Sequence, residues 1–440
     1  MPTRTDYEVA VAELRAQLGA LPPDAPVRLG KRTSNLFRPR SKVDHRLDVS
    51  AFSGVLEVGD GFAEVLGMTT YEDLVDATLP TGQMPLVVPQ LKTITLGGAV
   101  TGLGIESSSF RNGTPHESVL EMDVLTGDGR VVTCSRTDNP DLFYGFPNSY
   151  GTLGYALRLR IELEPTHPYV NLQHVRCASV AEAVEALTHH DADFVDGTWF
   201  SPTEVYVTLG RWADSAPVVS DYTGQQIYYR SIQRRREDWL TVRNYLWRWD
   251  TDWFWCSRAF GVQNPRIRRF VPRRYLRSDS YWKLVAFEQK HQWKARWDRR
   301  KGLPDQEPVI QDVEVPADRL VEFMDVFARE VPIEPVWFCP LQQRSADDVW
   351  ELYRLDPSVL YVNVGFWSAV PVKEDPAHHN KLIEDLVDSL GGRKSLYSTA
   401  FYDREHFWQL YNGATYDVLK KAYDPDSRLL DLYAKVVERR

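Results

Sequence analysis

The chain has 440 residues, of which 43% are hydrophobic and 26% charged, and its formal net charge is −9. At roughly 100 to 200 residues per domain, this length predicts two domains, and the composition excludes disordered and collagen-like proteins. The acidic balance argues against a general nucleic-acid-binding protein.

The N-terminal segment, residues 1–26, predicts an amphipathic helix that ends at a pair of prolines and lacks the apolar core of a signal peptide. No stretch approaches the roughly 18 apolar residues of a membrane-spanning helix. Cys134, Cys177, Cys256 and Cys339 lie far apart without a C-x-x-C pair, which predicts neither a zinc site nor a disulfide framework. We therefore expect a protein of the reducing cytoplasm.

The first third of the chain alternates short β-branched runs with glycine turns. Residues 68–82 predict a helix capped by Thr69 or Thr70, and residues 124–132 predict a β-hairpin with Asp-Gly at its turn. The alternating strand that follows, residues 155–163, is stopped by Pro165, and we expect the first domain to end within residues 165–170. This pattern indicates a mixed α+β domain.

The pattern changes after this boundary. Residues 180–190 and 317–331 show helical spacing, while residues 197–210, 308–316 and 359–370 are typical of strands. These segments predict an antiparallel sheet backed by helices. The expected fold class is α+β, with mixed sheets and helices in the first part and an antiparallel sheet in the second.

Positive charge is concentrated in residues 230–301, which hold 20 Lys or Arg and seven Asp or Glu, a balance of +13 that leaves −22 for the remainder. Eight of the 14 tryptophans lie in the same segment: Trp239, Trp247, Trp249, Trp253, Trp255, Trp282, Trp293 and Trp297. One interpretation is a solvated helical face over an aromatic core. The other is peripheral docking on an anionic membrane, because indole rings and cations suit the headgroup region.

In the docking interpretation, Trp253, Trp255 or neighbouring tryptophans insert at the membrane boundary, and a set of arginines binds lipid phosphates. These arginines are Arg234, Arg235, Arg236, Arg268, Arg269, Arg273 and Arg274.

A glycine-rich stretch at residues 88–113 carries the clearest chemical signal. It contains Gly97, Gly98, Gly102 and Gly104, with threonines before them and three serines after them. Such a run lets the backbone approach a diphosphate, although it also suits a plain tight loop. The G-x-G-x-x-G spacing of a dinucleotide fold and the G-K-[ST] of a P-loop are both missing.

Six elements resemble, in order, the FAD-binding domain of vanillyl-alcohol-oxidase (PCMH-type) flavoproteins. They are Pro89, the TLGG of residues 95–98, the GLGIESSSFRNG of 102–113, the hairpin at 127–129, the NPDLFYGF of 139–146 and the GTLG of 151–154. The IESSS of 105–109, the QDVEVP of 311–316 and the YDREHFWQLYNG of 402–413 are most similar to the delta-24 sterol reductase branch.

This resemblance implies an FAD-binding domain at 1–168, a substrate or cap domain at 169–405 and a C-terminal return to the FAD domain at 406–440. The FAD-contacting positions that it implies are Pro89, Thr95, Gly97, Gly98, Gly102, Gly104, Ile105, Ser107, Ser108, Ser109, Gly113, Gly151, Thr152 and Gly154. Covalent flavin attachment in this superfamily uses His or Cys near the phosphate loops. Neither occurs between Gly97 and Gly113, so we expect noncovalent FAD.

Two departures from the animal sterol reductases stand out. The membrane helix of those proteins is missing, and the glycine-rich first pyrophosphate loop is replaced by VRLGKRTSNLFR at 27–38. A short chain with a basic segment is more similar to bacterial FAD-dependent reductases that act with a lipid methyltransferase to make 10-methyl fatty acids.

The resemblance therefore implies reduction of an unactivated C=C bond in a membrane lipid, with NADPH or NADH as electron donor. The substrate expected first is a 10-methylene acyl chain. The alternatives are a sterol side-chain reductase, an alcohol or sugar oxidase or dehydrogenase, and a flavin-free lipid-binding protein.

Reduction of such an alkene requires a proton donor, because no carbonyl activates the bond. The donor needs a pKa raised by an apolar pocket. In residues 308–316, strand alternation places Asp312 and Glu314 on one face with Ile310, while Gln311 lies on the other face with three valines. Asp312 is therefore a candidate acid, and a solvated acid on an exposed sheet face is the alternative.

Two other places offer acids. The segment from Tyr397 to His406 contributes Tyr402 and Glu405, although Asp403 also reads as the cap of a helix here. Glu106 precedes the serine run and His116 follows it, and a structural hydrogen bond to the loop is equally consistent with Glu106. The adjacent histidine pairs 189–190 and 378–379 lack a third ligand, so we expect no metal site.

Overall fold

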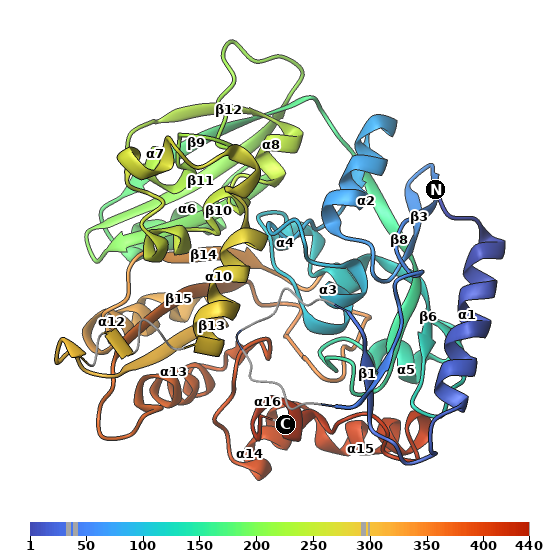
Figure 1. Cartoon of the computed structure of the whole chain (residues 1–440). Helices are drawn as coiled ribbons and strands as arrows, with labels where there is room; N and C mark the ends of the chain where they lie inside the picture. Colours follow the sequence, from blue (N-terminus) through green and yellow to red (C-terminus); the bar gives the residue numbers. More distant parts are fainter. Residues whose placement is uncertain (32–36, 38–42, 292–295, 298–299, 440) are drawn as a thin grey trace.

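The computed structural model describes residues 1–31, 37, 43–291, 296–297 and 300–439. Figure 1 shows two large sheets with the helix α3 (Leu96–Gly102) between them. The described strands form a six-stranded sheet, an eight-stranded sheet and a short pair, in which β1 (Val27–Leu29) runs parallel to β2 (His45–Leu47). The α+β class predicted from the sequence is confirmed.

The first sheet has the order β3-β4-β8-β6-β7, with β5 paired to β8, and all its pairs are antiparallel. Its strands are β3 (Val55–Gly59), β4 (Phe62–Leu66), β5 (Gln83–Pro85), β6 (Val119–Leu125), β7 (Val131–Ser135) and β8 (Tyr155–Pro165). The predicted hairpin is β6–β7, where Leu125 pairs with Val131. The predicted helix is α2 (Tyr71–Thr78), and the Thr70 side chain caps it by accepting from the Asp73 amide.

Both faces of β8 are covered, so its burial is nearly continuous from Ala156 to Leu159. Leu159 belongs to the core under α3, whereas Leu157 packs with the N-terminal helix α1 (Arg4–Gly19) on the opposite face. The predicted N-terminal helix is therefore confirmed. Its buried residues Tyr7, Leu14 and Leu18 cover the outer face of the sheet.

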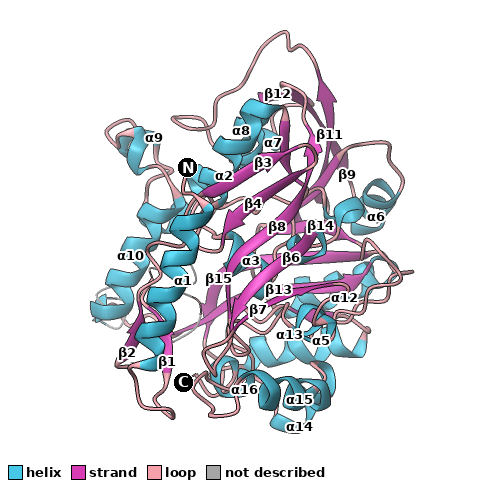
Figure 2. Ribbon diagram, turned by 90° about the vertical axis from the view of Figure 1, so that its right-hand side faces the viewer, coloured by secondary structure: helices cyan, strands magenta, loops and turns pink. Residues whose placement is uncertain are grey.

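The second sheet has the order β12-β9-β11-β10-β14-β15-β13-β16 and is antiparallel throughout (Figure 2). Its strands are β9 (Tyr169–Cys177), β10 (Phe194–Ser201), β11 (Glu204–Ala213), β12 (Glu237–Thr241), β13 (Gln306–Pro316), β14 (Val336–Leu341), β15 (Tyr361–Pro371) and β16 (Arg393–Lys394). A separate core joins one face of this sheet to α6 (Val180–Thr188), α12 (Leu320–Glu330) and α13 (His378–Ser389). The prediction of an antiparallel sheet backed by helices is confirmed.

The C-terminal helices return to the first sheet and lie below it in Figure 1. They are α14 (Arg404–Leu410), α15 (Gly413–Tyr423) and α16 (Leu432–Val436). The Gly127 amide donates to the Tyr423 carbonyl at 2.8 Å, and the Val27 amide donates to the Arg428 carbonyl at 2.9 Å. Asp403 caps α14 as predicted, because its side chain accepts from the His406 amide. Two further short helices, α4 (Ser109–Asn112) and α5 (Pro140–Gly145), complete this half.

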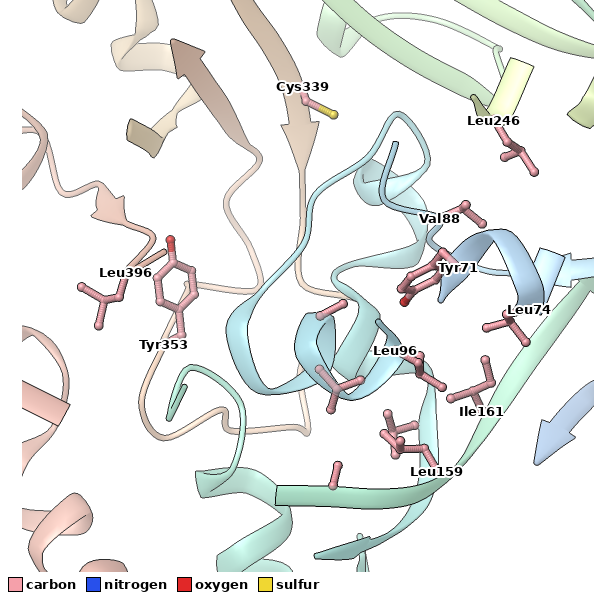
Figure 3. Packing of buried hydrophobic residues seen from close by; sticks show 14 of the residues in the cluster. Tyr71, Leu74, Val88, Leu96, Leu159, Ile161, Leu246, Cys339, Tyr353 and Leu396 are labelled. Atoms are coloured by element: carbon pink, nitrogen blue, oxygen red, sulfur yellow. The ribbon is translucent and has the colours of Figure 1, made fainter. Parts of the chain in front are cut away.

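The largest hydrophobic core extends across both halves of the molecule. Figure 3 shows Leu96 of α3 against Leu159 and Ile161 of β8, with residues of the second half in the same cluster. Among those are Leu246 and Cys339. The two sheets therefore share a continuous apolar interior around α3.

The tryptophan-rich segment contributes the edge strand β12 to the second sheet and otherwise forms helices and turns. The described helices are α7 (Tyr228–Ile232), α8 (Val242–Leu246), α9 (Pro265–Arg268) and α10 (Ser278–His291), with 3₁₀ turns η3 (Asp250–Asp252), η4 (Cys256–Phe260) and η5 (Arg273–Tyr275). Trp253 and Trp255 are only 6% and 2% exposed. Arg268 is 1% exposed and its guanidinium binds both carboxylate oxygens of Asp252, at 2.6 and 3.0 Å.

The expectation that Trp253, Trp255 and Arg268 contact lipid is therefore wrong. Burial in mutual ring contacts, such as the Trp249–Trp255 edge contact at 6.3 Å, and in a paired ion bridge removes them from the surface. Trp297 is 58% exposed, and Trp293 lies outside the described residues. No helix in the described ranges is long and apolar enough to cross a membrane.

Candidate active site

A cavity of about 410 Å³ lies between α3 and the second sheet. One wall comes from α3 and its flanking loops, and the other comes from β13, β14, β15 and the turn at Trp253. Eight of the positions implied for FAD contact line it: Pro89, Thr95, Gly97, Gly98, Gly102, Gly104, Ile105 and Gly151.

The glycines of this wall have different physical roles. A Cβ on Gly97 would lie 2.7 Å from the Gly67 carbonyl oxygen, so Gly97 allows α3 to pack closely on the sheet. Gly98 is exposed in the cavity, and a Cβ there would contact only the Thr95 hydroxyl, at 2.8 Å. Gly98 thus leaves bare backbone that a bound group can approach.

Cationic side chains surround the same wall. Arg28, Lys31 and Lys435 all line the cavity. The Lys31 ammonium donates to the Thr95 hydroxyl at 3.3 Å, and Lys435 donates to the Tyr150 carbonyl. These charges suit the diphosphate of a dinucleotide.

Two polar atoms at the cavity are unsatisfied within the described part of the chain, namely Gln90 Oε1 and Asn363 Oδ1. Buried polar groups normally find a partner, so each marks a place where a bound molecule can contribute a hydrogen bond. Together with bare Gly98 and the nearby cations, these atoms fit FAD.

The serine run does not reach the cavity. Ser108 Oγ donates to the Leu86 carbonyl at 2.8 Å, Ser109 Oγ accepts from the Glu106 amide at 2.9 Å, and Ser107 Oγ lies 2.7 Å from the Tyr245 hydroxyl. The serine hydroxyls therefore form hydrogen bonds within this loop and to neighbouring segments. Gly113, Thr152 and Gly154 are likewise absent from the described lining of the cavity.

The opposite wall is aromatic. Trp253, Phe254, Trp337 and Trp367 line the cavity, and the Phe254 and Trp367 rings have centroids 4.4 Å apart. Trp253 and Phe254 have φ values of +46° and +58°, which non-glycine residues adopt rarely. The surrounding packing holds this strained turn in place, and such strain is typical of functional sites. The wall is suited to an apolar substrate.

Asp312 lies in this aromatic wall. The predicted alternation is confirmed, because Val309, Val313 and Val315 face the helix-backed core while Asp312 lines the cavity. Its carboxylate accepts from the Asn363 side-chain amide at 3.2 Å and is hydrogen-bonded to Tyr397. The interpretation of Asp312 as a solvated surface acid is not supported.

Burial raises the pKa of Asp312 to about 6, against the lowering effects of its hydrogen bonds to Asn363 and Tyr397 and of the charge on Lys394. Its cross-strand neighbour on β15 is Gly365, where a Cβ would lie 2.4 Å from Asp312 Oδ1. The missing side chain at Gly365 therefore makes room for the carboxylate.

A buried acidic cluster lies behind Asp312. Glu314 and Glu384 are 0% and 1% exposed, and the Lys394 ammonium, also fully buried, lies 3.5 Å from Glu384 Oε1. Burial raises the pKa of Glu314 to about 8 and that of Glu384 to about 7, while it lowers the pKa of Lys394. Three carboxyl groups thus share one lysine, which favours protonated acids close to Asp312.

The other candidate acids lie away from the cavity. Tyr402 is buried beneath α14, and Glu405 is exposed on α14 and accepts from Gln409 at 3.4 Å. Burial raises the pKa of Glu106 to about 7, but its Oε1 accepts from Gln90 Nε2 and the Ser107 amide. These hydrogen bonds to its own loop are the ones expected for a structural role of Glu106.

His116 is also buried away from the cavity, and burial lowers its pKa to about 3.

Sequence reasoning missed several residues of the cavity: Arg28, Lys31, Tyr150, Trp337, Asn363, Trp367 and Lys435. These positions come from segments far apart in the chain, and only the fold assembles them. Asn363 and Trp367 could have been found from strand alternation, since β15 places alternate side chains on one face. Residues 32–36 and 38 of the unusual first loop lie outside the described residues.

Neither His nor Cys is found among the described residues that line the cavity. The described part of the chain contains no group of three His, Cys, Asp or Glu side chains that could hold a metal ion.

The fold and the cavity fit an FAD-binding protein. Residues 25–135 match the family model described as "FAD binding domain". The chain is distantly similar to the Delta(24)-sterol reductase of Rattus norvegicus, with 27% identity over 80% of this chain and 69% of that protein. The Delta(24)-sterol reductase of Arabidopsis thaliana is 21% identical over 93% of this chain and 79% of that protein.

Cytokinin dehydrogenase 5 of Oryza sativa is 25% identical over 84% of this chain and 72% of that protein. The chain is thus an FAD-dependent oxidoreductase distantly related to the sterol reductases.

Proposed function

We propose that the protein reduces an isolated carbon–carbon double bond in a lipid, using FAD and a nicotinamide donor, NADPH or NADH. The observation that carries this proposal is Asp312, an acid of raised pKa set in an aromatic wall that faces the bare backbone of Gly98 across one cavity. An unactivated alkene needs this combination, because a proton must be delivered in an apolar environment.

In the proposed reaction, Asp312 donates a proton to the less substituted alkene carbon. Reduced FAD, when bound, supplies the hydride that completes the saturated C–H bond on the other carbon. The net change is alkene plus NAD(P)H plus one proton to alkane plus NAD(P)⁺. Asn363 and Tyr397 hold the Asp312 carboxyl in place through their hydrogen bonds.

The aromatic wall has two roles in this scheme. Protonation leaves positive charge on the more substituted carbon, and the faces of Trp253, Phe254 and Trp367 stabilise such a charge through their π electrons. The same rings keep water away from the reacting carbon, which protects it from hydration.

Asp312 regains its proton from the buried cluster of Glu314, Glu384 and Lys394 in our proposal. The raised pKa values of both glutamates keep protons available near neutral pH.

Two substrates fit this chemistry. The names of the relatives favour a sterol side chain with a double bond at carbon 24. A methylene-substituted acyl chain, the substrate expected first from the sequence, presents the same doubly alkylated carbon. We place the sterol ahead of the acyl chain because the two relatives are named as sterol reductases.

The test is a reoxidation experiment. The FAD-loaded protein is reduced without oxygen and mixed separately with a Δ24-sterol, a methylene acyl phospholipid and aerated buffer, while the flavin absorbance is followed. Fast reoxidation by one lipid, with the saturated product found by mass spectrometry, supports the proposal and selects the substrate. Fast reoxidation by air alone would instead favour an oxidase, and no response to either lipid would refute the reductase assignment.

A further inference from the structure

A short surface segment combines exposed apolar and basic side chains. We define the docking loop as residues 265–275, which comprise α9, η5 and the residues between them. Its apolar side chains Ile267, Phe270 and Tyr275 are 47%, 74% and 50% exposed. Figure 2 shows α9 at the outer edge of the molecule, above α10.

Positive charge dominates the same segment. Residues 253–278 contain seven arginines and no acidic residue. Arg266, Arg269, Arg273 and Arg274 of the docking loop are exposed. Only Arg273 of these four pairs with a carboxylate among the described residues, Asp221 at 3.2 Å.

The basic and apolar groups of the docking loop are paired side by side. The Arg269 guanidinium lies 4.6 Å from the centroid of the Phe270 ring, and the Arg274 guanidinium lies 4.9 Å from that of Tyr275. Each pair places an aromatic ring beside a guanidinium group that can bind an anion. Transfer of an exposed phenylalanine side chain from water into the apolar part of a bilayer is favourable.

We propose that the docking loop binds the surface of an anionic lipid bilayer. Phe270, Ile267 and Tyr275 enter the headgroup boundary, and Arg266, Arg269 and Arg274 bind lipid phosphates. This surface replaces the buried Trp253, Trp255 and Arg268 that the sequence indicated, and the charge complementarity selects anionic over neutral lipid.

Arg268 connects the docking loop to the segment that forms part of the cavity wall. Arg268 points inward from α9 and pairs with Asp252, and its Nε donates to the Gly224 carbonyl at 2.8 Å. Asp252 directly precedes Trp253, which lines the cavity. The docking loop is thus connected through Arg268 and Asp252 to the aromatic wall, which receives the lipid in the proposed function. This last step rests on the proposed function, whereas membrane binding itself does not.

Vesicle co-sedimentation of the FAD-loaded full chain tests the proposal without substrate turnover. We compare phosphatidylcholine vesicles with vesicles in which about a third of the lipid is phosphatidylglycerol. Binding should favour the anionic vesicles and fall as salt rises. The triple change Arg266→Ser, Arg269→Ser and Arg274→Ser should weaken binding about 100-fold, at about 1 kcal/mol per cation and 1.4 kcal/mol per tenfold.

The variant Phe270→Ser should weaken binding about tenfold while keeping the salt dependence, because it removes only apolar contact. The matched control changes Arg319, Arg329 and Arg354 to serine, which removes the same charge from arginines that pair with Glu322, Glu330 and Glu351. This control should bind like the unchanged protein.

Equal binding to both vesicle types, no binding to either, or an equal loss in the control would overturn the proposal. So would a dimer that Phe270→Ser converts to monomers without changing vesicle binding, since the loop would then be an interface between copies. A protein that binds vesicles but reduces no lipid would refute only the proposed function.

Discussion

Asp312 illustrates how the properties of one residue depend on its neighbours. On the sequence, it is an acid in an alternating strand and could as well face solvent. In the structure, burial raises its pKa to about 6, while Asn363 and Tyr397 fix its position. The result is a carboxyl group that keeps its proton well above the pH at which an exposed aspartate loses it.

The first prediction is that Asp312→Asn slows reoxidation of the reduced flavin by the alkene about 10²- to 10⁴-fold, the usual contribution of a general acid. Reduction by the nicotinamide donor should be unchanged, because that half-reaction does not use this proton. Stopped-flow measurement of the two half-reactions separates them. A change under about threefold would remove Asp312 from the mechanism.

The role of Asp312 as proton donor also determines how alkene-dependent reoxidation changes with pH. The raised pKa means that the protonated form predominates below about pH 6 and is lost above it. Alkene-dependent reoxidation should therefore fall as pH rises through about 6, and Asp312→Asn should abolish this limb of the profile.

Gly98 is the second residue whose role can be tested, because its backbone is exposed in the cavity. The second prediction is that Gly98→Val lowers the bound flavin content severalfold, because its side chain occupies the cavity where backbone is now bare. Flavin is measured in the supernatant after acid precipitation, which also tests noncovalent attachment. Gly19→Val is the control, since a Cβ at Gly19 meets nothing within 4 Å.

Retained flavin in Gly98→Val would show that the bound group does not contact this backbone. Colour that stays in the precipitate of the unchanged protein would contradict the noncovalent prediction.

At the scale of elements, the sequence predicted those whose signals are local. Helix α2 begins at Thr70 and the β6–β7 hairpin turns at an Asp-Gly pair, because caps and turns are set by a few adjacent residues. The strict alternation expected for β8 fails, since α1 covers one face and α3 the other. Which elements pack on a strand is decided by distant parts of the chain.

The position of Asp312 depends on a pair of strands, β13 and β15. A methyl group at Gly365 would lie 2.4 Å from Asp312 Oδ1 and 2.8 Å from the Trp367 ring. The third prediction is that Gly365→Ala displaces the carboxyl and slows alkene-dependent reoxidation at least tenfold, with flavin content retained. The double variant of Gly365→Ala and Asp312→Asn tests whether the effect of Gly365→Ala acts through Asp312.

If Gly365 acts by positioning Asp312, the double variant should be about as slow as Asp312→Asn alone. Fully multiplicative losses would mean that Gly365→Ala damages the site in another way.

At the scale of the whole molecule, the cavity could not be predicted from local patterns. Lys31 and Lys435 come from opposite ends of the sequence, yet both line it. The tryptophans of residues 230–301 were visible as a group, but composition does not say which rings are buried. Only the structure shows that Trp253 lines the cavity and that its neighbour Asp252 pairs with Arg268.

The buried acids also set a property of the whole molecule, its stability against pH. Burial raises the pKa of Glu314 from 4.5 to about 8, so the folded state favours the protonated form more than the unfolded state does. This contribution is fully present below about pH 4.5 and is lost as pH rises through about 8. Stability should therefore fall with rising pH in this window, by up to about 1 kcal/mol per pH unit from this group.

The fourth prediction is that Glu314→Gln flattens the pH dependence of the thermal midpoint between about pH 5 and 8, because glutamine does not titrate. Tyr353 donates to Glu314 Oε2 and can donate equally to the glutamine oxygen, so the packing of the site is kept. The slope is the informative quantity, since an unpaired amide shifts all midpoints by a similar amount. Glu405→Gln, a change at an exposed glutamate of α14, is the control and should leave the slope unaltered. An unaltered slope in Glu314→Gln as well would show that Glu314 is ionised in the folded protein, and it could not then serve as a proton store for Asp312.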